Sequence, residues 1–511
     1  MAYTFPKKTT TIVIGLLALF NIALHLLYHG NLEFHRDELL YFALGLHPDL
    51  GYATVPPLIG WVAALIQSIF GYSLFAVKLL PALLSGVMVL LACRIAKELN
   101  GGTYAQILVG IVIVFMPFTL RTFHLYQPVH LDLLFWTFLL YYSIRYVNTQ
   151  KDSYLIYLGA LAGIGMLNKY LIALLIISLA VAILFSPHRN VFTKRAFFKG
   201  LLIGFILFLP NLIWQFTHDL PVLGHMGALN ERQLVNVDRG QFMLDQVLMT
   251  YGGILLVVSG IVYLFRKNKY RYLVFTAMIV VFVLVMLRGK SYYTLGILPM
   301  LVAAGAVALE KWIKNKIVRI VIPIFIVAIS IPIIPLGLPV YDEMGLVSYF
   351  EDLEKDYGLQ IGRTFEDGTI HSLPQDYADQ LGWEELTKVT ASAYASIPEK
   401  NKALIYCENY GQASAIAVIG KKYDLPEPIS FNESFLYWLP SEFDPEIEYF
   451  IYINGELGDN VAAFFEEIEV VGSITNPNAR EFGTTVFLCS KPKGSFNTFY
   501  KDVVESVEDP F

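Results

Sequence analysis

Carboxylate side chains are scarce in the first 340 residues, so those that border apolar segments are candidates for chemistry. This part of the chain contains only 12 Asp and Glu residues. Asp37 and Glu38 follow the first apolar run, and Asp132 opens a later one. An ionisable group at membrane depth is costly and is usually kept for a function, and a carboxylate can act as a general base. The alternative is that Asp37 and Asp132 are helix N-caps.

Cations and phenols gather between two later apolar runs. Arg288, Lys290, Tyr292 and Tyr293 share one short segment, and Lys169 interrupts another apolar stretch. Lysine and arginine hold phosphate through charge-assisted hydrogen bonds, so these residues are candidates for binding a phosphate at the level of the lipid headgroups. Lys, Arg and Tyr also accumulate at membrane boundaries as anchors, and that alternative stays open for the short segment.

The composition indicates a membrane protein. The chain has 511 residues, of which 56% are hydrophobic and only 16% are charged, whereas soluble domains contain about 25% charged residues. A helix needs roughly 20 apolar residues to cross the hydrocarbon core. The apolar runs predict about eleven transmembrane helices, at residues 11–29, 74–96, 104–120, 131–147, 153–167, 170–186, 198–216, 244–265, 272–288, 292–310 and 318–338.

The charge distribution divides the chain and predicts its orientation. Residues 1–340 carry 26 Lys and Arg against 12 Asp and Glu, whereas residues 341–511 carry 11 against 31. Most of the 26 basic residues lie in alternate loops, which the positive-inside rule places in the cytoplasm. We therefore expect the N-terminus inside and the C-terminal domain outside. The acidic domain argues against nucleic acid as a partner, because nucleic acid binds basic surfaces.

The regions outside the membrane have their own predicted structure. Residues 30–73 form a long outer loop whose amphipathic stretches are too short to span. Residues 341–511 are predicted to be a soluble α/β domain, with Cys407 and Cys489 in two of its strands. An oxidising compartment would allow these cysteines to pair, and two separate buried thiols are the alternative. The strands are predicted at 403–407, 447–454, 469–475 and 484–490, and the helices at 376–396 and 411–423.

Carboxylates and phosphate-binding cations on one face of a membrane point to a single chemistry. A carboxylate base removes a proton from an acceptor hydroxyl, and the hydroxyl attacks a sugar carbon. Cations stabilise the departing lipid phosphate, whose negative charge grows in the transition state. A polyprenyl-phosphate sugar suits such a site, because the lipid carrier delivers its headgroup at the interface.

Several short segments carry a resemblance to a known family. They are Asp37–Tyr41, Gly51–Trp61, Phe70–Gly71, Lys78–Ala82, Leu131–Trp136, Leu167–Tyr170, Leu209–Gln215, Arg288–Tyr293 and Glu408–Ala413. In order and spacing they resemble the protein O-mannosyltransferase-like bacterial membrane glycosyltransferases of families 39 and 83, whose relatives transfer aminoarabinose or galacturonic acid. The resemblance implies the glycosyltransferase C fold, a polytopic helical membrane domain over 1–340 followed by a periplasmic or extracytoplasmic α/β domain over 341–511.

The resemblance also implies roles for single residues. Asp37 would be the catalytic base, with Glu38 beside it, and Asp132 would be a second functional acid near the acceptor or a metal. A divalent metal is an open alternative, with Asp37, Glu38 or Asp132 as its ligands. Helices of the 30–73 loop would lie along the membrane over a donor cavity. From the residues themselves, we expect the donor phosphate to be held by Lys290, Arg288, Lys169, Tyr292 and Tyr293.

One position departs from the family pattern. Relatives often have lysine or histidine immediately before a pair of prolines, and here Val55 precedes Pro56 and Pro57. If that side chain contacts the donor phosphate in relatives, another cation must replace it, and Lys290 and Lys169 are the candidates.

We therefore expect an inverting glycosyltransferase of the cytoplasmic membrane. It would move a sugar from a polyprenyl-phosphate donor to lipid A, another glycolipid, a polysaccharide or a protein on the outer face. The sequence names neither the sugar nor the acceptor. Two alternatives are a lipid or polysaccharide transporter, in which the carboxylates relay protons, and a non-catalytic family member whose outer domain binds glycans.

Lys290→Ala is expected to weaken binding of the donor lipid about tenfold or more, because a hydrogen bond to a charged group contributes roughly 1.5–3 kcal/mol. Binding of polyprenyl phosphate to the purified protein in detergent measures this, with Lys199→Ala, at the predicted cytoplasmic end of the 198–216 run, as the control. Unchanged affinity in the Lys290 variant would remove this residue from the phosphate site.

Overall fold

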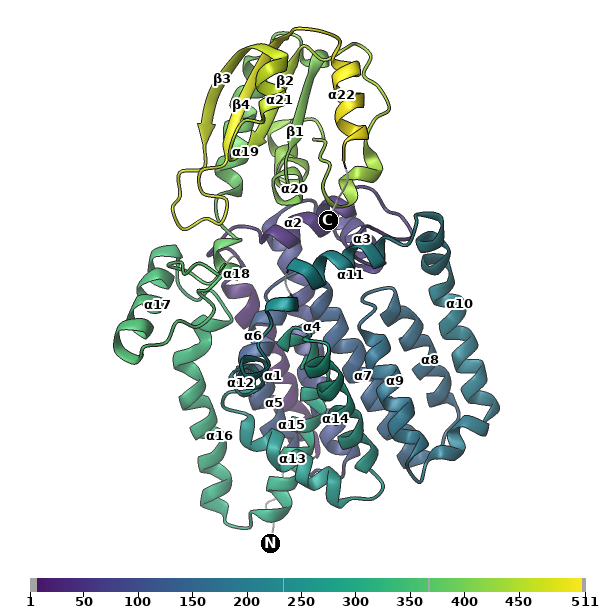
Figure 1. The fold of residues 1–511 in the computed structure, drawn as a ribbon. Helices are drawn as coiled ribbons and strands as arrows, with labels where there is room; N and C mark the ends of the chain where they lie inside the picture. The colour runs from purple at the N-terminus through teal and green to yellow at the C-terminus, as the bar shows by residue number, and fades with distance from the viewer. Residues whose placement is uncertain (1–6, 233, 366–367, 508–511) are drawn as a thin grey trace.

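The protein is described by a computed structural model that covers residues 7–232, 234–365 and 368–507. A bundle of helices lies below a smaller domain built around a sheet, and short helices lie between the two (Figure 1). The bundle contains α1 Lys7–Leu27, α4 Leu74–Glu98, α5 Thr103–Phe115, α6 Pro117–Thr122, α7 Pro128–Thr149, α8 Ser153–Met166, α9 Ile172–Leu184, α10 Arg195–Thr217, α13 Ile254–Arg266, α14 Arg271–Met286, α15 Leu298–Trp312 and α16 Lys316–Ser330.

Each predicted apolar run is helical for most of its length. Among the described residues, five helical segments are long and apolar enough to cross a membrane, or six if one bent pair counts as a single span. Five further apolar helices are shorter. The chain breaks at Asn168 and Lys169, between α8 and α9, where the sequence predicts two short helices.

One predicted helix is wrong in shape. The run at 244–265 was expected to be continuous, but α12 Arg239–Met249 and α13 meet at an angle of 100°. The break contains Gly252, whose φ of 78° lies in the left-handed region that glycine adopts without steric cost. Two glycines inside an apolar run therefore end one helix and start another.

Short elements connect the bundle to the outer domain. Residues 30–73 hold α2 Arg36–Leu44 and α3 Leu58–Phe70, and a later outer segment holds α11 Pro221–Arg232. These three helices lie between the bundle and the sheet domain (Figure 1). The 3-10 helices of this half of the chain are η1 Arg189–Thr193, η2 Leu234–Asn236, η3 Ser291–Ile297 and η4 Ile331–Leu336.

The C-terminal domain has a four-stranded mixed sheet of order β1-β2-β4-β3, in which β1 and β2 are parallel and the other pairs are antiparallel. The predicted strands are confirmed, while the helix predicted over 376–396 is split where Gly382 has a φ of 91°. The elements are α17 Glu343–Tyr357, α18 Gln375–Ala378, α19 Trp383–Ser396, η5 Lys400–Lys402, β1 Ala403–Cys407, α20 Tyr410–Val418, η6 Gly420–Tyr423, η7 Glu433–Trp438, β2 Tyr449–Asn454, α21 Asp459–Phe464, β3 Phe465–Ser473, β4 Thr485–Pro492 and α22 Phe496–Glu505.

The two faces of this sheet belong to different hydrophobic cores, as the two-residue period of a strand requires. Cys407 lies in one core and Cys489 in the other. All three cysteines of the chain are free thiols. Cys407 and Cys489 are therefore separate buried thiols on opposite faces of the sheet, which decides the question that the sequence left open.

One of these cores extends beyond the domain. It joins residues of α2, α3 and α4 to residues of α19, α20 and the sheet, including Leu39 and Trp383, both of which are fully buried. The 30–73 loop and the C-terminal domain therefore share one apolar interior, which fixes how the sheet domain sits on α2.

Helices α8 and α10 pack through glycines. A Cβ atom on Gly159 would overlap the carbonyl oxygen of Gly200, and one on Gly163 would overlap that of Gly204. Within α8, Gly159 and Gly163 have the spacing of the small-residue motif that lets membrane helices approach closely. Gly200 and Gly204 have the same spacing within α10.

Gly159→Ala is expected to lower the thermal unfolding temperature in detergent, because overpacking of this kind costs about 1–3 kcal/mol. Gly15→Ala in α1 is the matched control, since no heavy atom lies within 4 Å of the added Cβ. Equal unfolding temperatures for the two variants would contradict the close packing of α8 and α10.

Candidate active site

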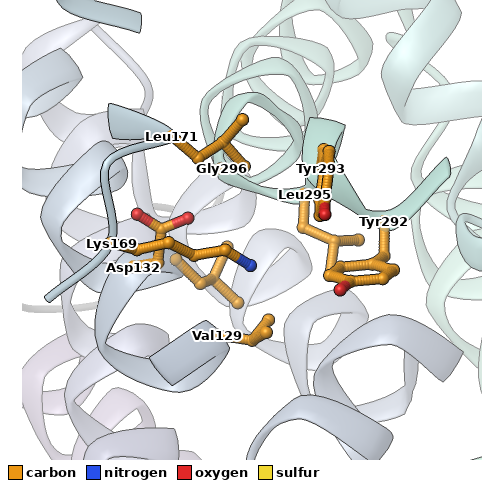
Figure 2. A pocket seen from close by; sticks show the side chains of 9 residues that line it. Val129, Asp132, Lys169, Leu171, Tyr292, Tyr293, Leu295 and Gly296 are labelled. Atoms are coloured by element: carbon orange, nitrogen blue, oxygen red, sulfur yellow. The ribbon is translucent and has the colours of Figure 1, made fainter. Parts of the chain in front are cut away.

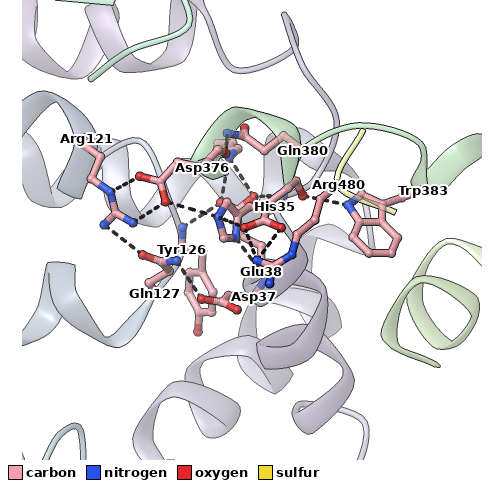
Figure 3. Close-up of polar contacts among 12 residues, drawn as sticks. His35, Asp37, Glu38, Arg121, Tyr126, Gln127, Asp376, Gln380, Trp383 and Arg480 are labelled. Atoms are coloured by element: carbon pink, nitrogen blue, oxygen red, sulfur yellow. Dashed lines mark hydrogen bonds and ion pairs between the residues drawn. The ribbon is translucent and has the colours of Figure 1, made fainter. Parts of the chain in front are cut away.

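Asp37 lies in the first turn of α2, between the bundle and the C-terminal domain. The helix begins there because His35 is its N-cap and forms a capping box with Glu38. The Asp37 carboxylate accepts a hydrogen bond on each oxygen, on Oδ2 from Gln127 Nε2 at 3.0 Å and on Oδ1 from the Tyr410 hydroxyl at 3.2 Å. Figure 3 shows the first of these partners beside the carboxylate.

Glu38 is fully buried and its carboxylate is surrounded by donors. Lys78 Nζ lies 2.8 Å from both oxygens. The backbone amides of His35 and Tyr126 donate to the same group, at 2.9 and 2.8 Å. These bonds join α2 to α4 and to the segment that precedes α7. Glu38 therefore holds in place the helix turn that presents Asp37, and no lone pair of its carboxylate faces a cavity.

A chain of polar contacts connects Asp37 to the C-terminal domain (Figure 3). Arg121 Nη1 donates to Gln127 Oε1 at 3.3 Å, which orients the carboxamide whose Nε2 meets Asp37. Arg121 also makes a two-pronged ion pair with Asp376, at 2.6 and 2.9 Å. Such a pair fixes the guanidinium plane, so the C-terminal domain contributes to the orientation of Gln127.

His35 lies beside this ion pair. Its Nε2 is 3.8 Å from Asp376 and 3.9 Å from Asp379. Burial acts to raise the pKa of Asp376, but Arg121 and then His35 hold that pKa well below its usual range. Burial acts to lower the pKa of His35, and Asp376 with the neighbouring carboxylates holds it above its usual value. The contact between the bundle and the C-terminal domain is therefore charged as well as apolar.

A second group of predicted residues meets at a narrow cavity between α7, the α8–α9 break and η3 (Figure 2). Asp132, Lys169, Tyr292 and Tyr293 all line it. Asp132 Oδ1 accepts a hydrogen bond from Trp136 Nε1 at 3.0 Å. Lys169 Nζ lies 5.1 and 4.9 Å from the centres of the Tyr292 and Tyr293 rings, within the range of a cation–π interaction.

This cavity is small. Its volume of about 10 Å³ corresponds to a single water molecule. A sugar phosphate would fit only after the lining side chains move. The Tyr292 and Tyr293 rings stand opposite Lys169 in Figure 2 and are the side chains whose movement would enlarge the space.

Electrostatic contacts connect the cavity to the surroundings of Asp37. The charge of Lys169 interacts with those of Asp132, Lys290 and Arg121. The Tyr292 phenol interacts with both Arg121 and Asp37. Arg121, which donates to the Gln127 side chain that holds Asp37, therefore also acts on Lys169 of the cavity.

Arg288 lies elsewhere. It lines a separate open cavity of about 350 Å³ with Val235, Val237, Asp238 and Arg239. Its Nη1 donates to the Val235 carbonyl at 2.5 Å. The structure thus brings four of the predicted residues to one cavity and puts Arg288 in another.

The residues suggested as metal ligands lie in two places. Asp37 is hydrogen-bonded to a carboxamide and a phenol and Glu38 to Lys78, whereas Asp132 lines the narrow cavity with Lys169. In the described part of the chain, no group of three or more His, Cys, Asp or Glu side chains could hold a metal.

Sequence reasoning did not assign roles to four residues that surround Asp37. Gln127 and Tyr410 contact Asp37, Arg121 contacts Gln127, and Asp376 contacts Arg121. Tyr410 lies in one of the segments that carry the family resemblance, which was the available signal. Asp376 carries no such signal, because its partner is 255 residues away in the sequence.

The chain has a helical membrane domain and a mixed-sheet domain at the C-terminal end. It is similar to ArnT from Cupriavidus metallidurans in complex with undecaprenyl phosphate, with a TM-score of 0.66 at 12% identity over 94% of this chain and 98% of that one. It is also similar to an oligosaccharyltransferase from Archaeoglobus fulgidus, with a TM-score of 0.50 at 13% identity over 86% and 67% of the two chains.

The sequence comparisons confirm the predicted resemblance. The model of the dolichyl-phosphate-mannose-protein mannosyltransferase family matches residues 54–214, which include α3 to α10. The lipid A galacturonosyltransferase RgtD of Rhizobium johnstonii is 24% identical over 229 residues. That alignment covers 43% of this chain and 46% of RgtD, so the chain matches about half the length of this relative.

Lys78→Met is expected to destabilise the protein by about 3–5 kcal/mol, because it leaves the Glu38 charge buried without its partner. Chemical unfolding in detergent measures the change. Adding Glu38→Gln to the variant should restore part of the loss, since the unpaired charge is then removed.

The control is Lys491→Met, which breaks an exposed ion pair with Glu467 on the sheet domain and should leave the unfolding transition unchanged. A Lys78 variant as stable as wild type would show that the buried pair does not hold α2 in place.

Proposed function

We propose that this protein is a glycosyltransferase that moves a sugar from a polyprenyl-phosphate donor to an acceptor at the outer face of the cytoplasmic membrane. The observation that carries the proposal is the contact of Gln127 with both Asp37 and Arg121, at 3.0 and 3.3 Å, together with the electrostatic interaction of Lys169 with Arg121 and Lys290. A base for the acceptor and a cluster that attracts phosphate are the two parts that the reaction needs.

The comparisons support this reading. One structure with the same fold is that of ArnT bound to undecaprenyl phosphate, and the matched relative RgtD is a lipid A galacturonosyltransferase. A lipid-phosphate sugar is therefore the donor class that we favour, and lipid A or a related glycolipid is the leading acceptor. A polysaccharide or a protein acceptor is chemically equivalent at the attacking hydroxyl.

In the proposed reaction, Asp37 takes the proton of the acceptor hydroxyl. The acceptor oxygen forms a bond to the anomeric carbon of the sugar, while the bond from that carbon to the phosphate oxygen breaks. The lipid phosphate leaves with the bonding electrons, and attack from the opposite face inverts the anomeric centre. Lys169 and Lys290 stabilise the phosphate charge as it grows.

Residues of the narrow cavity have supporting roles in this scheme. Tyr292 and Tyr293 would donate hydrogen bonds to the phosphate once their rings have moved from Lys169. Asp132 would keep Lys169 in position through its opposite charge. We assign the phosphate to Lys169 and Lys290 rather than to Arg288, because Arg288 faces the separate cavity.

The proposal includes an orientation and a division of the chain. Residues 1–340 form the membrane domain with about eleven spanning helices, the N-terminus is cytoplasmic, and residues 341–511 form the outer domain. The basic loops support this orientation. Helices α2 and α3 of the 30–73 loop would then lie at the outer surface of the membrane, where a lipid carrier presents its headgroup.

Asp37→Asn is expected to reduce transfer at least a hundredfold, because a positioned general base contributes about 10²–10⁴ in rate. The amide keeps the size of the side chain, so folding and donor affinity should be retained. Purified protein in detergent is given undecaprenyl-phosphate sugars with an envelope glycolipid extract, and the products are measured by mass spectrometry.

Asp49→Asn is the matched control, since this exposed carboxylate of the same loop accepts a hydrogen bond only from the Leu50 amide among the contacts described. Transfer at the wild-type rate in the Asp37 variant would show that Asp37 is not the base. Transfer in detergent needs no sealed membrane, so product formation would also exclude a pure transporter.

A further inference from the structure

We infer that Tyr410 of the C-terminal domain is a positioning residue for the Asp37 carboxylate, so that docking of this domain completes the active site. This inference rests on the proposed function, because it gives Asp37 the role of base. It adds a residue from beyond residue 340 to a site that the sequence assigned entirely to the membrane domain.

Two hydrogen-bond donors hold the Asp37 carboxylate, one on each oxygen, and we call this arrangement the clamp. Tyr410 donates to Oδ1 and Gln127 donates to Oδ2, at 3.2 and 3.0 Å. Two donors on different oxygens fix both the position and the plane of a carboxylate. Each carboxylate oxygen has two lone pairs, so the clamp leaves one on each oxygen to accept the proton of an acceptor hydroxyl.

Tyr410 is itself held firmly at the start of α20. Its backbone amide donates to Asn432 Oδ1 at 3.1 Å. The Arg36 guanidinium lies over its ring, 4.3 Å from the ring centre. The next residue is Gly411, where an added Cβ would lie 2.6 Å from Arg36 Nε. The close approach of α20 to α2 therefore depends on glycine at this position.

The turn that carries Tyr410 is hydrogen-bonded to Glu481 of the C-terminal domain. Asn409 caps α20 through its side-chain oxygen, and its Nδ2 donates to Glu481 at 3.2 Å. Gln412 donates to the same carboxylate at 2.9 Å. Glu481 in turn lies 4.0 Å from Arg36 Nη2. One network thus joins the start of α20 to the residue that precedes Asp37.

The Tyr410 hydroxyl stays a donor under ordinary conditions. Burial raises the pKa of Tyr410 well above its usual value, and the negative charge of Asp37 raises it further. A neutral phenol that donates to a carboxylate favours the charged form of that carboxylate. Removing the hydroxyl should therefore weaken this preference, and the acid limb of the pH–rate profile should move to higher pH.

Other groups also act on the charge of Asp37, and they stay in place when Tyr410 is changed. The positive ones among them favour its ionised form, and the negative ones oppose it. They are His35, Arg36, Tyr41, Arg121, Tyr292, Asp379 and Glu433.

The test is Tyr410→Phe, which keeps the ring and its contact with Arg36. We expect kcat to fall about tenfold, as the loss of one hydrogen bond to a charged group implies. The acid limb of kcat should move up by roughly half a pH unit, while KM for the undecaprenyl-phosphate sugar should stay the same. A purely structural role would change the amount of folded protein and leave the pH profile where it was.

The matched control is Tyr452→Phe, because Tyr452 in the same domain donates to the Glu408 carboxylate at 3.0 Å. This variant loses the same kind of bond away from Asp37 and should keep the wild-type profile. An unchanged profile in Tyr410→Phe, or an equal shift in both variants, would overturn the inference.

A second measurement separates this inference from the proposed function. A hydrophobic carbodiimide labels protonated carboxyl groups, and mass spectrometry of the labelled peptide across a pH series follows the titration of Asp37 without any turnover. A higher midpoint in Tyr410→Phe than in wild type would support the clamp. If this shift were observed while wild-type protein transferred no sugar, the clamp would be supported and the proposed function would be refuted. If the midpoint did not shift, only the clamp would be refuted.

Discussion

The interaction on which the rest of the structure depends is the buried ion pair of Glu38 and Lys78. Both side chains are almost fully buried, at 0% and 3% exposure. A buried charge without its partner is strongly destabilising, so the two helices that carry them must stay together. The remaining bonds of Glu38 fix the first turn of α2 and the segment that leads into α7. Asp37 and Gln127 are thus placed by the same carboxylate.

The second constraint is the apolar interior that α2 and α3 share with the C-terminal domain. Because this core continues into α19, α20 and the sheet, the domain is packed against the 30–73 loop rather than attached only by a linker. The ion pair of Arg121 with Asp376 adds a charged contact to the same interface. The surroundings of Asp37 are therefore built from residues that lie far apart in the sequence.

The sequence could predict what local patterns determine. Apolar runs located the helices and the strand 403–407, and the polar pair Asn168 and Lys169 located the break between two of the helices. It could not predict the 100° bend after Met249, because glycines in an apolar run are compatible with a straight helix or a broken one. It named Asp37 and the residues of the narrow cavity, but not Tyr410, since 373 residues separate the two partners. Such contacts exist only once the chain has folded.

The two thiols on opposite faces of the sheet have a consequence for how this protein is made. With Cys407 and Cys489 buried in different cores, the C-terminal domain owes its stability to packing and not to a covalent cross-link. Its maturation is therefore independent of the redox state of the compartment in which it folds. A cell could assemble this domain without oxidoreductases that introduce or rearrange disulfides.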